Sequence, residues 1–86
     1  MHTVELLEQA LSLAEQMGYR VRQEWMGGVG GGICEFGGRK WLFVDLALNA
    51  VEQLEQVRMA LETDQGLHTV PLSPVMSRLL GVRRAA

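Results

Sequence analysis

One stretch limits the fold of this chain more than any other, because residues 40–46 read as a strand that is apolar on both faces. Successive side chains of a strand point to opposite sides of a sheet. One side here carries Trp41 and Phe43, and the other carries Leu42, Val44 and Leu46. A strand of this kind is expected to be covered on both faces. The fold must therefore supply cover for two sides of one strand.

Hydrophobic periodicity predicts a helix before and after the strands. Two adjacent rows of apolar residues at three- and four-residue spacing predict a first helix that Thr3 caps and Gly18 ends. Asn49, with Glu52 three residues later, has the pattern of a capping box. The second helix then runs to about Thr63.

Alternation predicts a strand over residues 19–26, and short apolar runs predict strands over 33–36 and 40–46. Residues 67–72 are expected to be extended. Ser73 followed by Pro74 predicts a short third helix, which Gly81 ends.

Gly37 and Gly38 predict a tight hairpin, because glycine accepts the two positive φ angles of a primed turn. A two-residue loop fixes the register of the second and third strands. It places Glu35 opposite Lys40, Cys34 opposite Trp41, and Gly31 and Gly32 opposite Val44 and Phe43.

These elements predict a single α+β domain over residues 1–86, with a frayed tail at 83–86. The order is α-β-β-β-α-(β)-α, with a three-stranded antiparallel sheet and helices packed on one face.

A chain of 86 residues buries only about 63% of its surface, enough for one thin core. The short third helix is poorly sized to close the second face. We expect a homodimer to cover it, at Trp41, Phe43, Leu42 and Val44. The alternative is closure by residues 67–72 with the third helix.

Composition argues against several classes of protein. Cys34 is the only cysteine, so no disulfide forms within the chain and a reducing, cytoplasmic compartment is expected. No apolar run approaches the roughly 20 residues of a membrane span. The net charge is −2 and the pI is near 5.6, which gives no general attraction to nucleic acid or anionic lipid.

The stretch from Gly27 to Gly32 contains five glycines in six residues. A dinucleotide fingerprint would open a helix, whereas a strand follows here, and a P-loop lysine is missing. We expect a mobile connection between strands, because ordering glycine costs much backbone entropy. One alternative is that Gly31 and Gly32 extend the second strand and let a helix or a second subunit approach the sheet closely. Another is an anion-binding nest of amides at Gly28, Gly30 and Gly31, beside Cys34.

Residues with catalytic chemistry are few and scattered. A catalytic triad could be drawn from Cys34, Asp45 and His68, but nothing in their spacing indicates one. A free cysteine in a strand usually behaves as a small hydrophobic residue. His2, His68 and Cys34 lack the close pairing of zinc ligands. We expect no metal and no cofactor, and the pattern argues against an enzyme.

The order of roughly the first 60 residues resembles two families in layout. It is similar to the double-stranded RNA-binding domain, which implies a lysine cluster at the start of the second helix, but residues 49–55 are acidic. It is also similar to the core of restriction-type nucleases. That implies a strand-borne Asp/Glu-x-Lys, and Gly38 stands two residues before Lys40 instead.

These observations favour a non-enzymatic interaction or structural module that forms a homodimer. One alternative is a small-ligand-binding protein or enzyme that uses the 27–32 loop with Cys34, Asp45 or His68. Another is nucleic-acid binding through four basic residues, Arg20, Arg22, Arg39 and Lys40.

Overall fold

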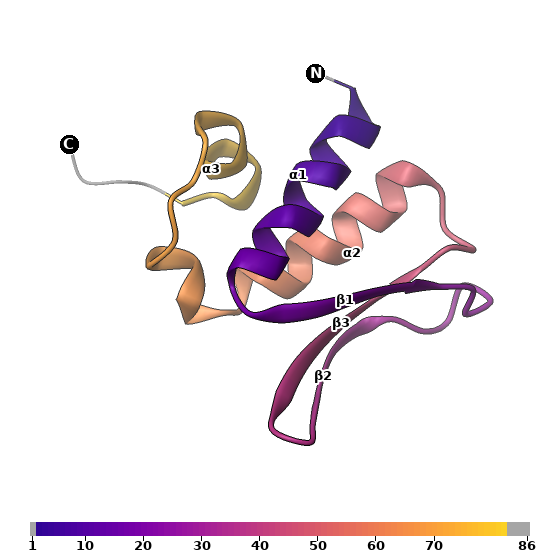
Figure 1. Cartoon of the computed structure of the whole chain (residues 1–86). Coiled ribbons are helices and arrows are strands. Elements are labelled where there is room, and N and C mark those ends of the chain that lie inside the picture. Colours follow the sequence, from indigo (N-terminus) through magenta and orange to yellow (C-terminus); the bar gives the residue numbers. More distant parts are fainter. Residues whose placement is uncertain (1, 83–86) are drawn as a thin grey trace.

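The computed structural model describes residues 2–82, and the predicted tail at 83–86 lies outside them. The chain forms a layer of helices on one face of a sheet (Figure 1). In chain order the elements are α1 (Thr3–Gln16), β1 (Tyr19–Glu24), β2 (Gly32–Phe36), β3 (Arg39–Asp45), α2 (Ala50–Glu62), the 3₁₀ helix η1 (Gln65–His68) and α3 (Pro74–Leu80). The predicted α+β class and the packing of helices on the sheet are confirmed.

The sheet is mixed, so the predicted antiparallel sheet was wrong in one pairing. Its order is β1-β3-β2, and β3 pairs parallel with β1 and antiparallel with β2. The long connection over residues 25–31 places β2 at the far edge of the sheet. β3 then lies in the central position, between β1 and β2. This places the strand with two apolar faces between two neighbours rather than at an exposed edge, where such a strand is a liability.

The hairpin prediction is confirmed for every pair within β2, whereas the expected pair of Gly31 with Val44 lies beyond the start of β2 at Gly32. Gly37 and Gly38 have φ angles of 60° and 74°, as a primed two-residue turn requires. The observed register pairs Glu35 with Lys40, Cys34 with Trp41, and Gly32 with Phe43.

The core lies between the helices and one face of the sheet. Leu42 and Val44 of β3 are fully buried there, together with Val57 and Leu61 of α2 and Ala14 of α1. Two helices cover β1 and β3 but leave β2 exposed along most of its length. Within residues 2–82, no helix lies on the second sheet face (Figure 1).

Two of the three predicted helix N-caps are confirmed. Asn49 and Glu52 form the capping box of α2. Ser73 caps α3, whose end is Gly81 in the left-handed conformation. The prediction for α1 was wrong, because Thr3 is already helical and His2 is the N-cap, without a side-chain cap bond.

The extended segment predicted over residues 67–72 was wrong at its start, because Leu67 and His68 belong to η1, and no strand forms over the rest. The chain turns directly after α2 into η1, where the Asp64 side chain accepts the Gly66 N–H at 2.8 Å. A carboxylate that bonds the backbone two residues on favours such a turn over a strand.

Candidate interaction surface

The sheet face without helices gathers rings and guanidinium groups. Residues opposite one another in the ladders share a face, and the registers bring together one set from all three strands. We call this set the aromatic face: Arg20, Arg22, Cys34, Phe36, Arg39, Trp41 and Phe43. Because β3 directs Leu42 and Val44 to the helices, its alternate residues must point here.

Three rings lie beside one another with nearly parallel planes. The Phe36 and Trp41 centroids are 5.4 Å apart with an interplanar angle of 2°, and those of Trp41 and Phe43 are 6.0 Å apart at 16°. The Arg20 guanidinium carbon lies 5.9 Å from the Trp41 ring centroid. Each such contact contributes roughly 0.5–1.5 kcal/mol. The face is therefore an ordered array rather than a set of loose side chains.

Trp41 also holds a hydrogen-bond donor that is not used. Its indole Nε1 is buried and has no hydrogen-bond partner within residues 2–82. An N–H removed from water without an acceptor carries an energetic penalty.

The four basic residues suggested for nucleic acid do not act as one group. Lys40 points to the helix side, where its Nζ lies 3.1 Å from Asp64 Oδ2. Arg22 forms an exposed ion pair with Glu24 at 2.9 Å. Arg20 and Arg39 remain on the aromatic face, so it keeps a positive charge in a chain of net charge −2.

The suggested interface residues divide between the two sides of β3. Trp41 and Phe43 belong to the aromatic face. Leu42 and Val44 have no exposed surface and form the core under α1 and α2. A partner that approaches the open sheet face therefore meets the first pair only.

The glycine connection is held by Asp45. The Asp45 carboxylate, which has no exposed surface, accepts the N–H groups of Met26, Gly28 and Ala47 at 2.9, 2.7 and 2.9 Å. Burial alone would raise the pKa of this carboxyl, but the backbone hydrogen bonds lower it overall. The loop amides thus surround a carboxylate of the chain itself. An external anion near Gly28 would meet that negative charge.

Gln56 of α2 also holds the glycine connection in place. Its Oε1 accepts the Asp45 N–H at 3.0 Å, and its Nε2 donates to the Gly30 carbonyl at 3.0 Å. The composition of the loop does not indicate this anchor, because both anchoring side chains, Asp45 and Gln56, lie outside residues 27–32. The mobility of residues 27–32 stays a prediction.

The three residues considered for catalysis are not assembled. Asp45 is committed to backbone amides. Cys34 is exposed on the aromatic face, and His68 is exposed on η1. Within residues 2–82, no group of three or more His, Cys, Asp and Glu side chains is placed to hold a metal ion.

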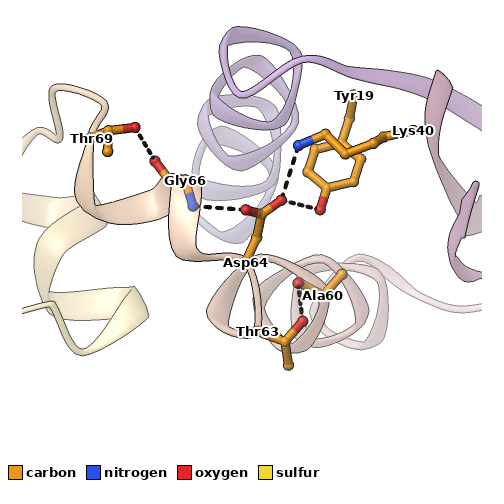
Figure 2. Close-up of polar contacts among 7 residues, drawn as sticks. All are labelled: Tyr19, Lys40, Ala60, Thr63, Asp64, Gly66 and Thr69. Carbon is orange, nitrogen blue, oxygen red and sulfur yellow. Dashed lines mark hydrogen bonds and ion pairs between the residues drawn. The ribbon is translucent and has the colours of Figure 1, made fainter. Parts of the chain in front are cut away.

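A polar cluster that the sequence did not indicate ties α2 to the sheet. Asp64, just after α2, accepts hydrogen bonds from the Tyr19 hydroxyl, the Lys40 ammonium and the Gly66 amide (Figure 2). Lys40 Nζ also lies 4.4 Å from the centroid of the Tyr19 ring. Tyr19 and Asp64 are 45 residues apart, so no local pattern could have revealed the pair.

The charges of this cluster fit a structural role. The hydrogen bond from Tyr19, followed by that from Gly66, lowers the pKa of Asp64. Burial, and then the bond to Asp64, raises the pKa of Tyr19. Near neutral pH the carboxylate stays charged and the phenol stays protonated. Neither group is then suited to exchange protons as a general acid or base.

Comparison of the chain with protein-family models, curated proteins and solved structures gave no match. No helix within residues 2–82 has the length and apolar character to cross a membrane.

Proposed function

We propose that the protein is a non-enzymatic interaction module that forms a homodimer through the aromatic face. The observation that carries the proposal is the ring array of Phe36, Trp41 and Phe43 on a sheet face that no helix of the described chain covers. Aromatic residues and arginine are the types enriched in protein–protein interfaces. The single cysteine favours a cytoplasmic setting. There Cys34 would lie in the dimer interface as a free thiol.

A two-fold contact suits this face despite its positive charge. In a self-complementary interface each residue meets a different residue of the second copy unless it lies on the axis. Arg20 already lies over a ring within one copy. The same guanidinium can stack on a ring of the partner instead of facing the partner's arginine.

Sedimentation equilibrium at micromolar concentration tests the dimer. We expect twice the chain mass of 9.6 kDa. Trp41→Ala should weaken association, since truncated aromatic hot spots cost about 2 kcal/mol or more. Trp25→Ala is the matched control, because Trp25 is 75% exposed and outside the face. Phe36→Ala serves as a second probe if Trp41→Ala unfolds. A wild-type chain found only at 9.6 kDa rules the dimer out.

A single-stranded nucleic acid is the second candidate occupant of the same face. The specific observation is Arg20 over the ring of Trp41, since rings beside cationic groups form the stacking platforms of single-strand binders. Such binding would weaken steeply with salt. A gel shift with a short single-stranded oligonucleotide distinguishes this case. The absence of a shifted complex at low salt would rule out single-stranded nucleic-acid binding.

A further inference from the structure

The outer edge of β2 offers backbone groups for an added strand. In a hairpin closed by a two-residue turn, the pair beside the turn is hydrogen-bonded, and the pairs then alternate. Phe36, Cys34 and Gly32 therefore direct their backbone groups to β3. Ile33 and Glu35 direct theirs outward, where no other strand of the described chain pairs with β2.

A groove runs along the helix side of this edge. One hollow of about 560 Å³ lies between β2 and α2, with Ile33, Met59 and Thr63 in its lining. A second hollow of about 410 Å³ shares Ile33 and Thr63 with the first and continues to Glu35. The two hollows together follow β2 from Gly31 to Glu35. Both hollows are shallow and open to solvent, and we call the two together the β2 groove.

The middle of the β2 groove is apolar and exposed. Ile33 is 41% exposed and Met59 is 59% exposed. An extended peptide paired with the edge of β2 would place every second side chain into this groove. The position of the β2 groove along the edge of β2 therefore suits an added strand.

Charge indicates which strand fits. The first hollow is lined by Glu52 and Glu55 and by no basic side chain. Glu35 lies at the far end, where Lys40 is already paired with Asp64. Arg58 pairs with both Glu55 and Glu62, so α2 keeps more negative than positive charge along this side. Basic side chains of a partner would meet complementary charge at both ends.

We infer that the β2 groove binds an extended peptide as a fourth, antiparallel strand, with an apolar residue opposite Ile33 and basic residues on either side of it. A second copy of the chain fits this site less well. Antiparallel pairing of all five residues of β2 with themselves sets the partner's Glu35 opposite Ile33. That brings a carboxylate into a groove rimmed by carboxylates, which is unfavourable. This site is separate from the aromatic face.

The test uses a heptapeptide designed for this register, acetyl-Thr-Lys-Val-Leu-Thr-Lys-Thr-amide, in which Leu falls opposite Ile33. Its two lysines then lie near Glu35 and near the Glu52 end. The same peptide with glutamate for both lysines is the charge control. Binding is followed by amide shifts and amide hydrogen exchange in NMR spectra of the full chain, with peptide up to about 1 mM.

We expect saturable shifts and slowed exchange at the amides of Ile33 and Glu35, the two groups that face outward. The glutamate peptide should bind at least about tenfold more weakly. Met59→Arg should weaken binding of the lysine peptide by a similar factor. Val51→Arg should leave it unchanged, because Val51 is 63% exposed on α2 but does not line the groove.

Three outcomes would overturn the inference. These are absence of shifts at Ile33 and Glu35 at the highest peptide concentration, equal binding of both peptides, and equal effects of Met59→Arg and Val51→Arg. Shifts confined to Trp41 and Phe43 would assign the peptide to the aromatic face instead. Sedimentation of the unliganded chain reports on the dimer separately, so the two proposals can fail independently.

Discussion

Replacing Gly31 by alanine tests whether Gln56 anchors the glycine loop. Gly31 has a φ of +107°, and a Cβ there would overlap the Gln56 amide, with Cδ at 2.7 Å. Gly32 has a φ of +106°, and a Cβ there would meet nothing within 4 Å. The two substitutions therefore share the backbone strain and differ in the collision.

The magnitude follows from the bonds that Gln56 must release. Alanine at either position costs roughly 1–3 kcal/mol in backbone strain. At Gly31 the Gln56 side chain must also rotate away and give up its bonds to Asp45 N–H and Gly30 C=O. At about 1 kcal/mol each, these losses make Gly31→Ala costlier than Gly32→Ala by about 2 kcal/mol. That is a large part of the roughly 5–15 kcal/mol typical of a domain.

Urea unfolding followed by tryptophan fluorescence measures the difference, from the midpoints at equal slope. In a Gln56→Ala background the two alanine variants should cost the same, because the colliding amide is gone. Free energies of unfolding for Gly31→Ala and Gly32→Ala that agree within about 0.5 kcal/mol in the wild-type background, the usual limit of additivity, would show that Gln56 does not anchor the loop.

Three further predictions concern single contacts. Asn49→Ala removes the capping box of α2 and should lower the free energy of unfolding by about 1 kcal/mol, measured in urea. Tyr19→Phe should cost about 1 kcal/mol at neutral pH through the lost bond to Asp64. Because the pKa of Tyr19 is raised, the hydroxyl's contribution is complete below about pH 10 and is lost as pH rises through the folded value. The wild type should therefore lose stability in alkali more steeply than Tyr19→Phe. Because the pKa of Asp64 is lowered, its contribution is present above about pH 3.9 and is lost as pH falls through the folded value. The stability gap between wild type and Asp64→Asn should close in acid, and a constant gap from neutral pH to pH 2 would contradict this.

The elements that the sequence predicted correctly are those whose hydrogen bonds close within a few residues. Asn49 and Glu52 are three residues apart and bond each other's backbone. Gly37 and Gly38 set the turn, and the turn then fixed the pairing of Cys34 with Trp41. The aromatic side of β3 followed from alternation alone.

The roles of the carboxylates could not be read in this way. Asp45 stands at the end of an apolar strand, and its partners at Met26 and Gly28 lie 19 and 17 residues away. Nothing near it in the sequence shows that a loop folds onto it. Asp64 follows a helix with no local sign that Tyr19 and Lys40 will converge there. The β2 groove was likewise hidden, since it depends on where α2 lies over the sheet.

The sequence by itself determined three α-helices, three strands, the hairpin register and the two apolar faces of β3, because these depend on residue spacing and on turns between neighbours. Only the tertiary structure decided that β1 runs parallel to β3, with β2 left at an edge. The alternating pattern of residues 19–26 suits either strand direction equally well. Joining β1 to β3 closes a long loop over β2, and the entropy of that closure is offset only when packing against α1 and α2 buries the shared face.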